Sequence, residues 1–508
     1  MKRFLPLFFP IVLFFCIGHL DAQPKYEFRA AWVATVDNID WPTKGNYNTQ
    51  SQKQEFIKIL DMHKRNGMNA VIVQIRPAAD AFYPSPYEPW SEWLSGKQGQ
   101  PPSPYYDPLA FMITETHKRG MEFHAWCNPY RAEFRIGVSS IAPNHITKLH
   151  PEWFMNYGDT RYFDPGNKEV QQFVTNVIRD IVRRYDVDAI HFDDYFYPYR
   201  IAGKEFPDNA SYAKYGNGMS KEDWRRSNTD SIIVMLGKAI KEENKFCRFG
   251  ISPFSVWRNI DKDSVGSQTK AGQTNYDDLY ADILLWLKNG WIDYVVPQLY
   301  FEFGHRAVPY EVMLDWWGRH SYGRQCYIGL GLYRANSNPA WRDKSLIPRQ
   351  IAELRKNAAV QGMIFFSSKS FENNPNGWCD SLQNNYFKYP ALIPPMNWID
   401  TTKPHEPAFK SRFSKKDSVL SSFLSSVETE KNIKGFAIYR ADKENANLDS
   451  LAPFQFVPWS VDAKFDLKIT PLQRSNHYVY YVSCVSRTNV ESRPIMMFSF
   501  AAPTNSTE

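Results

Sequence analysis

The sequence predicts a mixed α/β protein: a (β/α)₈ TIM barrel followed by a small all-β sandwich. Short apolar runs alternate with segments of helical spacing from about residue 28 to residue 392. Beyond the Pro-Pro pair at 394–395 the pattern changes to short alternating runs without helical spacing. Strands that alternate with helices imply parallel pairing through right-handed crossovers. Eight such units over about 365 residues fit a closed barrel with enlarged loops.

Composition narrows the function classes. The 508 residues are 16% aromatic and carry a net charge of only +6, so no basic footprint indicates a nucleic-acid partner. The first strand lacks a Gly-rich phosphate turn, which disfavours a doubly wound dinucleotide fold. The six cysteines form no CxxC pair. We therefore expect no cofactor and no metal ion, and we expect Cys127, Cys247 and Cys326 to be small buried hydrophobes.

The first residues predict a secretory signal peptide at 1–22. A positive start, Met1 to Arg3, precedes an apolar stretch at 4–17 and the small residue Ala22. An uncleaved membrane anchor is the alternative, but the stretch is short for a span and contains Pro6 and Pro10. No later stretch is long and apolar enough to cross a membrane. We expect an exported protein in the periplasm or cell envelope, or a secreted one.

The expected barrel domain covers 23–393. Its strands are expected at 29–36, 70–75, 122–127, 188–192, 249–252, 294–299, 326–330 and 362–366. The clearest helix is 170–182, where apolar residues recur at helical spacing after a turn at 164–167 that supplies a cap. Other helices are expected at 52–65, 109–119, 221–241, 276–288, 310–317 and 348–357.

The expected β-domain covers 394–508. Strands are expected at 435–440 and 478–484, and the alternation of Tyr478, Tyr480 and Val482 resembles the penultimate strand of a fibronectin type III sandwich. We expect a spacer or a stabilising appendage, with a catalytic or sugar-specific role as the alternative.

Polar and aromatic residues gather where five of the expected strands end, which is the face on which barrels carry their active sites. Carboxylates flanked by planar aromatics suit carbohydrate, because a sugar stacks one apolar face on a ring while its hydroxyls need polar partners. The candidate substrate-binding residues are Arg76, Asp80, Asn128, Tyr130, Arg131, His191, Tyr195, Trp257, Gln298, Tyr300 and His305. The aromatic excess is therefore expected to form a rim that faces sugar.

Glycoside hydrolysis needs two carboxyl groups. In the strand 188–192 the apolar residues should face the helices, so that His191 and Asp193 face inward. Asp193 is the preferred nucleophile or charge stabiliser, and Asp194 is the second choice. Glu302 is the preferred general acid, because the hydrophobic neighbours Phe301 and Phe303 favour a protonated carboxyl group.

Alternatives remain for these residues. The Asp-Asp pair could be a helix cap or a loop ion-pair partner, and Glu302 a solvated loop residue. Arg76 and Asp80 could form an ion pair across the barrel mouth, and Trp257 and Tyr300 could be rim packing. His191 and Asp193 could instead bind the metal of a deacetylase.

Several blocks together resemble the glycosyl-hydrolase-like family ten. They are FRAAWVATVDNIDWP, VQIRPAADAFYPS, HAWCNPYR, DAIHFDDYFYPY, ISPFSVWRN and VPQLYFEFGH, within about residues 26–390. The resemblance implies an exported barrel that acts on glycans, often with a C-terminal fibronectin-like domain, and peptide-free peptidoglycan strands as a reasonable substrate. It implies that Arg76, Asn128, Asp193, Asp194, Gln298 and Tyr300 lie in shared active-site blocks. Phe301 stands where the family pattern has Trp.

The leading hypothesis is thus an exported glycoside hydrolase with a glycan substrate. The alternative is a non-catalytic carbohydrate-binding or cell-envelope scaffold protein on the same fold. Convergence of two carboxyl groups on one aromatic pocket would distinguish them.

Overall fold

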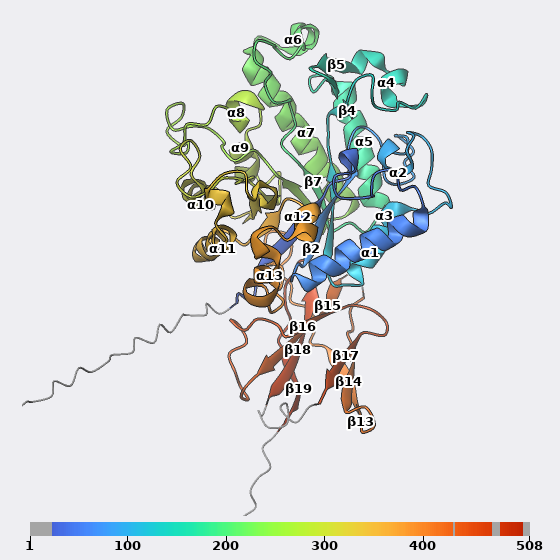
Figure 1. The fold of residues 1–508 in the computed structure, drawn as a ribbon, viewed down its shortest axis with the longest axis vertical. Coiled ribbons are helices and arrows are strands. Elements are labelled where there is room, and N and C mark those ends of the chain that lie inside the picture. Colours follow the sequence, from blue (N-terminus) through green and yellow to red (C-terminus); the bar gives the residue numbers. More distant parts are fainter. Residues whose placement is uncertain (1–22, 430–431, 470–477, 501–508) are drawn as a thin grey trace, which may run out of the picture.

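The structure is a computed structural model that describes residues 23–429, 432–469 and 478–500. It consists of a barrel with helices around it and a smaller β-domain at one end (Figure 1). The expected signal peptide, 1–22, lies outside the described residues.

Parallel strands form the barrel, as predicted. They are β1 (Phe28–Val33), β2 (Ala70–Arg76), β3 (Glu122–Cys127), β7 (Ala189–Phe192), β8 (Arg248–Ile251), β9 (Tyr294–Val295), β10 (Gln325–Cys326), β11 (Ile328–Leu330) and β12 (Gly362–Phe365). Their order is β10-β9-β8-β7-β3-β2-β1-β12-β11. The short segments β10 and β11 are one predicted strand, interrupted at Tyr327. Because β10 pairs with β9 while β11 pairs with β12, this strand joins the two edges of the sheet.

Helices connect these strands. They are α1 (Thr49–Arg65), α2 (Glu92–Ser95), α3 (Pro108–His117), α4 (Ile146–Leu149), α5 (Lys168–Arg184), α6 (Asn209–Tyr215), α7 (Lys221–Glu243), α8 (Asn275–Asp278), α9 (Ile283–Lys288), α10 (Tyr310–Arg319), α11 (Leu346–Lys356), α12 (Ser368–Asn373) and α13 (Trp378–Ser381). Single turns of tighter or wider helix lie at Val36–Asn38, Pro151–Trp153, Leu332–Arg334, Ala340–Arg342, Pro375–Gly377 and Leu382–Tyr386.

One predicted helix is wrong. The segment 276–288 forms two helices, α8 and α9, because Tyr280 between them adopts a positive φ of 51° that ends the helical path. The side chain of Asp282 then caps α9 by accepting a hydrogen bond from the backbone N–H of Leu285 at 3.2 Å.

Helix α5 shows why the predicted pattern folds as it does. Asn167 caps its start by accepting from the backbone N–H of Glu169 at 2.9 Å, which confirms the predicted turn. In its apolar stripe, Val174 and Ile178 are fully buried against the outer face of the barrel. A second core fills the barrel interior, with Phe28, Trp32, Ile72, Trp126 and Tyr294 among its members.

The β-domain is a two-layer antiparallel sandwich, as predicted. One sheet has the order β13 (Ala408–Ser414), β14 (Val419–Ser425), β17 (Lys464–Lys468). The other has the order β16 (Gln455–Pro458), β15 (Ile433–Ala441), β18 (Val479–Ser486), β19 (Ile495–Ser499). Leu424 and Phe465 of the first sheet share one core with Phe436 and Tyr480 of the second.

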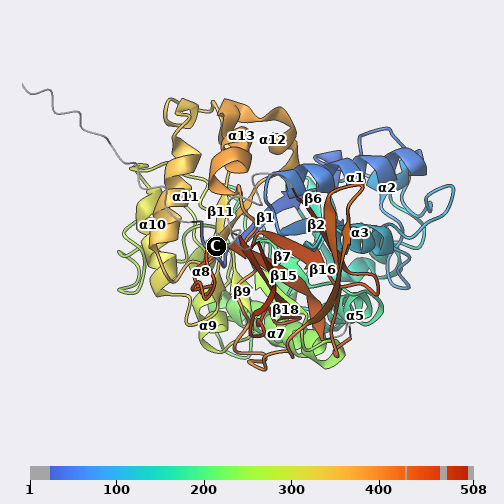
Figure 2. The ribbon, with the colours of Figure 1, turned by 90° about the horizontal axis from the view of Figure 1, so that it is seen from below.

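This domain lies against the base of the barrel. Lys434 of β15 contacts Glu122, the first residue of β3, and Arg487 pairs with Asp186 at 2.6 Å. Figure 2, seen from below, shows β15, β16 and β18 in front of the barrel strands. The β-domain therefore covers the amino ends of the strands and leaves their carboxyl ends open. A third small antiparallel sheet, β4 (Arg131–Glu133), β5 (Phe154–Tyr157) and β6 (Thr160–Phe163), lies in the long connection after β3.

The aromatic excess is mostly core. The fully buried tryptophans are Trp41, Trp224, Trp286, Trp317, Trp341 and Trp378, so the predicted sugar-facing rim is wrong for these residues. The five cysteines of the described chain are free and buried, which confirms the interpretation of Cys127, Cys247 and Cys326 as small hydrophobes. Between residues 23 and 500, no helix that the structure describes has the length and apolar character of a membrane span.

Substituting Gly250 tests the packing of the barrel interior. An alanine Cβ at this position of β8 would lie 2.0 Å from the Tyr294 ring, so we expect Gly250→Ala to lower the free energy of unfolding by about 1–3 kcal/mol or more. Chemical denaturation measures this effect. Gly272→Ala is the control, because no atom lies within 4 Å of its added Cβ. Equal stability of the two variants would contradict the packing described.

Candidate active site

Two consecutive carboxyl groups lie directly after β7. Asp193 is 6% exposed and Asp194 is 2% exposed. Ile190 and Phe192 pack outward against the helices, whereas His191 contacts Trp32 and Tyr294 in the barrel interior. The predicted alternation along this strand is therefore confirmed, and it brings Asp193 to the open end of the barrel.

The Asp193 carboxylate is held by donors from neighbouring strands. Asn128 Nδ2 donates to Oδ2, and Trp126 Nε1 donates to the same oxygen at 3.3 Å. The orientation of the Asn128 amide is fixed, because its Oδ1 accepts from Gln74 Nε2 at 2.6 Å and from Arg131 Nη2 at 3.0 Å. Only the amide nitrogen can then face Asp193.

Gln74 connects this group to the loop after β1. Its Oε1 accepts from the backbone N–H groups of Thr35 at 3.0 Å and Val36 at 2.9 Å. Strands β1, β2, β3 and β7 thus contribute to a single buried hydrogen-bond network around one carboxylate.

Asp194 has its own partners. The Tyr199 hydroxyl donates to Oδ2, and the side chain of Gln298 also hydrogen-bonds the carboxyl group. Gln298 itself donates to the carbonyl of Ser252 at 2.9 Å, which ties the end of β9 to the end of β8.

Both carboxyl groups hold protons more tightly than an exposed aspartate. Burial raises the pKa of Asp193 to about 6, although the nearby Arg131 charge opposes the shift. Burial and the adjacent Asp193 charge raise the pKa of Asp194 to about 7. The pair therefore combines a more acidic and a less acidic carboxyl group.

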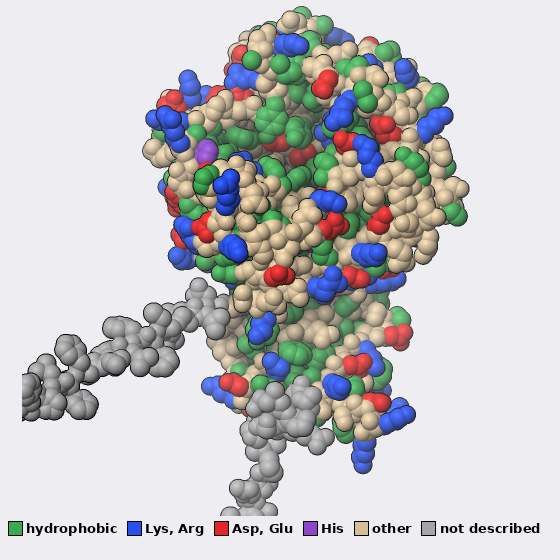
Figure 3. Space-filling model, viewed as in Figure 1, with side chains coloured by type: hydrophobic (Ala, Val, Ile, Leu, Met, Phe, Trp, Pro, Cys, Tyr) green, Lys and Arg blue, Asp and Glu red, His purple; other side chains and the backbone are tan. Residues whose placement is uncertain are grey.

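Aromatic rings line the other side of the mouth. Tyr300 lies 5.6 Å from Tyr333 at 88° and 6.2 Å from Phe366, and Phe366 lies 6.0 Å from Trp32. Tyr333 is 53% exposed. Figure 3 shows a hollow in the upper half of the molecule that is lined by hydrophobic side chains, with acidic atoms in its depth. Acidic and aromatic side chains gather together there, as glycan binding requires.

Two predicted substrate-binding residues, Arg76 and Asp80, are instead buried and contact the loops around the site. Arg76 is fully buried and pairs with Glu88, with Nε donating to Oε2 at 2.8 Å, so the alternative of an ion pair with Asp80 is wrong. Arg76 also donates to the carbonyl of Pro129 at 3.2 Å, which fixes the loop after Asn128. Asp80 accepts from the backbone N–H of Ala78 at 3.1 Å, and burial raises its pKa to about 7.

Glu302 is held elsewhere. Its carboxylate accepts from Trp341 Nε1 at 2.8 Å and from Asn338 Nδ2 at 3.2 Å. Among the hydrogen bonds of the described residues, none joins Glu302 to Asp193 or Asp194. The charge of Asp193 acts on the carboxyl group of its sequence neighbour, Asp194.

Three further candidates serve packing. Trp257 is 6% exposed, donates to Asp282 at 3.1 Å and stacks on Trp316, which favours the rim-packing alternative. His305 Nδ1 accepts from the backbone N–H of Val308 at 3.1 Å. Tyr130 is fully buried in the outer core.

The structure keeps two candidates beside the carboxyl pair. The backbone N–H of Tyr195 donates to Asp193 Oδ1 at 3.5 Å, and its ring lies 5.8 Å from the Arg131 guanidinium. Arg131 is half-buried there.

His191 does not favour the metal-dependent alternative. Its Nε2 accepts from Trp32 Nε1 at 3.2 Å, and its Nδ1 lies 3.0 Å from the Tyr294 hydroxyl, so both ring nitrogens have protein partners. No cluster of three or more metal-ligating side chains occurs among the residues that the structure describes.

Sequence reasoning missed several residues of the site, namely Trp32, Gln74, Trp126, Tyr199 and Tyr333. The first three lie within predicted strands, where strand alternation marks them as inward-facing. Tyr199 and Tyr333 lie in loops that carry no comparable signal.

Comparison with known proteins identifies the family of this chain. A family model described as Glycosyl hydrolase-like 10 matches residues 27–345. The chain is 43% identical to Glycosyl hydrolase YngK of Bacillus subtilis (strain 168), with 93% of each chain covered. It is 37% identical to Glycosyl hydrolase DigH of Escherichia coli (strain K12), over 70% of this chain and 85% of that protein.

Among solved structures, the PgaB (BpsB) glycoside hydrolase domain from Bordetella bronchiseptica aligns with a TM-score of 0.42 at 13% identity, covering 71% of this chain and 99% of that one. This likeness is distant, and the barrel assignment rests on the strand order given above. Because the family model spans more than half of the sequence and two named glycosyl hydrolases match most of it, the chain belongs to the glycosyl hydrolase-like 10 family and is a glycoside hydrolase.

Proposed function

We propose that this glycoside hydrolase cleaves a polysaccharide of bacterial or environmental origin by means of Asp193 and Asp194, and that peptide-free peptidoglycan strands are its substrate. The observation that carries the mechanism is the pair of adjacent, buried carboxyl groups with different pKa values at the open end of the barrel. The signal-like sequence at 1–22 supports export to the periplasm or cell envelope, where such glycans occur.

The roles follow from the order of the two pKa values. Near pH 6 to 7 the proton resides first on Asp194, while Asp193 carries the charge. Asp194 then donates its proton to the glycosidic oxygen as the C–O bond breaks. Asp193 stabilises the positive charge that develops at the anomeric carbon, or attacks that carbon. Water supplies the oxygen that the anomeric carbon gains, and its proton restores Asp194.

Arg131 supports an acidic substrate. Its Nε donates to the carbonyl of Pro77 at 2.9 Å and its Nη2 to Asn128, so the guanidinium is fixed in place. Its charge acts directly on Asp193. A fixed cation beside the reacting sugar suits a glycan that bears a carboxylate, such as the lactyl group of peptide-free peptidoglycan.

Removing the Asp193 charge tests the central role. We expect Asp193→Asn to lower kcat on the order of 10² to 10⁴-fold, because the amide neither attacks nor stabilises positive charge. Mass analysis of products from peptide-free peptidoglycan strands, and from the same strands with reduced carboxyl groups, measures both cleavage and the need for the acidic group. Full activity of the variant would contradict the mechanism. Equal cleavage of the native strands and of the strands with reduced carboxyl groups would contradict the proposal that the substrate must be acidic.

A matched pair of variants separates the two candidate acids. We expect Asp194→Asn to lose activity, whereas Glu302→Gln should keep kcat within about threefold, because Glu302 binds Trp341 and Asn338 instead of the reacting group. Substrates with an activated leaving group need little protonation and should recover much of the Asp194→Asn loss. Inactivity confined to Glu302→Gln would reverse the assignment.

The same pKa shifts predict how stability depends on pH. The folded protein holds protons on Asp193 and Asp194 that the unfolded chain, with Asp pKa near about 3.9, releases. Their contribution to the free energy of unfolding is therefore complete below about pH 4 and is lost as the pH rises to about 7. We expect Asp194→Asn to become more stable than the wild type above pH 7, on the order of 1–4 kcal/mol. Urea unfolding of the variant and the wild type at pH 5 and pH 8 measures this difference in stability. The same difference at both pH values would refute the prediction.

A further inference from the structure

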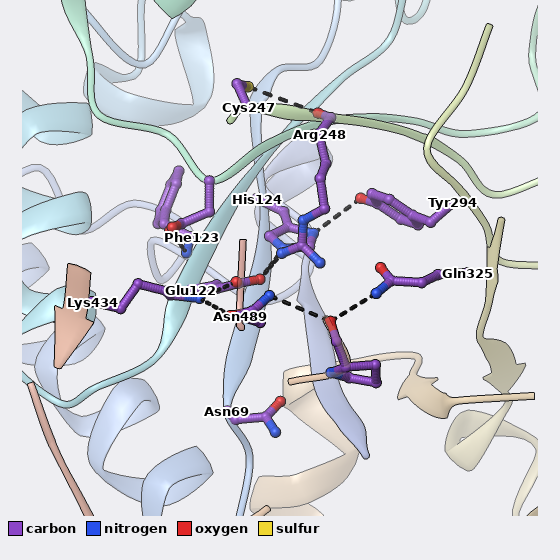
Figure 4. Close-up of polar contacts among 12 residues, drawn as sticks. Asn69, Glu122, Phe123, His124, Cys247, Arg248, Tyr294, Gln325, Lys434 and Asn489 are labelled. Atoms are coloured by element: carbon purple, nitrogen blue, oxygen red, sulfur yellow. Dashed lines mark hydrogen bonds and ion pairs between the residues drawn. The ribbon is translucent and has the colours of Figure 1, made fainter. Parts of the chain in front are cut away.

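The base of the barrel interior contains charged and polar side chains. Glu122 is 2% exposed, and Arg248 and His124 are fully buried. Barrel interiors are usually filled by branched apolar side chains, and a buried charge is costly unless it is paired. Here Arg248 and Lys434 both pair with Glu122, and Lys434 reaches it from β15 of the β-domain (Figure 4).

A chain of hydrogen bonds runs from this carboxylate along the barrel axis. His124 Nε2 lies 3.0 Å from Glu122 Oε2, and His124 Nδ1 lies 2.9 Å from the Tyr294 hydroxyl. The same hydroxyl lies 3.0 Å from His191 Nδ1, and His191 Nε2 lies 3.2 Å from Trp32 Nε1. Residues of β1, β3, β7 and β9 are linked in this way.

The Trp32 end of the chain fixes the direction of its upper bonds. The Trp32 indole can only donate, so His191 Nε2 accepts and the His191 proton lies on Nδ1, from which it donates to Tyr294. At the lower end, His124 Nε2 faces Arg248 Nη2 at 3.0 Å as well as the Glu122 carboxylate, so a guanidinium donor and a carboxylate acceptor both lie next to this nitrogen.

Both histidine rings are neutral in this chain. Burial lowers the pKa of His124 to about 3 and that of His191 well below its usual value. Arg248 also pairs with Glu122, so two charged groups hold the lower end of the chain.

The upper end of the chain lies at the floor of the active site. Trp32 is 3% exposed and lies 6.0 Å from Phe366, which adjoins Tyr300. Trp32 also shares the inner core with Trp126, whose indole donates to Asp193. The ring of Trp32 therefore lies beneath the space between the aromatic side of the mouth and the catalytic carboxyl groups.

We propose that Trp32 is the floor against which the reacting sugar binds, and that His191, Tyr294 and His124 are positioning residues that fix its indole and anchor it, through Glu122, to Lys434 of the β-domain. The inference rests on the proposed function, because it assigns a role in the same site. It makes the β-domain part of the catalytic machinery, since one of its side chains holds the lower end of the chain.

Removing one hydroxyl tests the chain. Tyr294→Phe keeps the ring but leaves both histidine Nδ1 atoms without their partner, and we expect kcat/KM for the glycan to fall at least tenfold. Tyr327→Phe is the control, because Tyr327 lies in the same inner core while its hydroxyl contacts Gln325 and Arg248 and neither histidine of the chain. We expect the control to keep kcat/KM within about twofold at a comparable loss of thermal stability. Equal kinetic losses in the two variants would overturn the proposal.

A double-mutant cycle shows whether the effect passes through Trp32. In a Trp32→Phe background the indole donor is absent, so Tyr294→Phe should cause little further loss of kcat/KM. An undiminished loss in that background would overturn the positioning role. If Asp193→Asn is fully active in the same assay, the proposed function fails instead, whatever Tyr294→Phe does.

Two variants of the β-domain test whether its contact with Glu122 affects activity. Lys434→Met and Arg487→Met each remove an ion pair between the domains, but only Lys434 contacts Glu122. We expect at least a fivefold loss of kcat/KM for Lys434→Met and less than a twofold loss for Arg487→Met. Equal losses would overturn the coupling between the domains.

A measurement on the wild-type protein tests the chain even if the variants fail to fold. Spectra of ¹⁵N-histidine-labelled protein should show both rings neutral, with the His191 proton on Nδ1, unchanged from pH 5 to pH 8. The opposite tautomer of His191, or titration of either ring in that range, would overturn the chain.

Discussion

Closure of the parallel sheet is the constraint on which the rest of the structure depends. The strand that comprises β10 and β11 pairs with β9 along one half and with β12 along the other, so the two edges of the sheet meet. Once the sheet is closed, all carboxyl ends of the strands face one mouth and all amino ends face the opposite base. The polar residues that follow β3, β7 and β9 are thereby brought together although they are far apart in the sequence.

Closure also creates an interior that water does not reach, and this chain fills part of that interior with polar side chains. Such groups are tolerated only where each has a partner. At the mouth, Gln74 and Asn128 satisfy one another and orient a donor toward Asp193. At the base, Glu122 takes its partners from the barrel and from the β-domain. Hydrogen bonds and ion pairs in the barrel interior therefore connect the candidate site at the mouth with the β-domain at the base.

The proposed catalytic carboxyl groups, those of Asp193 and Asp194, differ from ordinary surface aspartates because they are adjacent and buried. Burial raises the pKa of both, and the charge of Asp193 raises the pKa of Asp194 further. Two carboxyl groups of different acidity thus occupy neighbouring positions of one loop. Ionisation of both buried carboxyl groups lowers the free energy of unfolding. A cost of this kind is common in functional sites.

Strand and helix periodicity determined the barrel from the sequence alone, because apolar residues at a spacing of two or 3.6 can be buried only in those elements. Alternation within one strand also identified Asp193 as inward-facing. The hydrogen-bond partners of side chains in loops could not be predicted from the sequence. Glu302 follows β9 among aromatic residues, yet only the fold shows that Trp341 and Asn338 hold it. Likewise, the partner of Arg76 is Glu88 rather than Asp80. Contacts across the closed barrel, including the chain from Trp32 to Lys434, are decided by the tertiary structure, because they join residues whose separation along the chain carries no local signal.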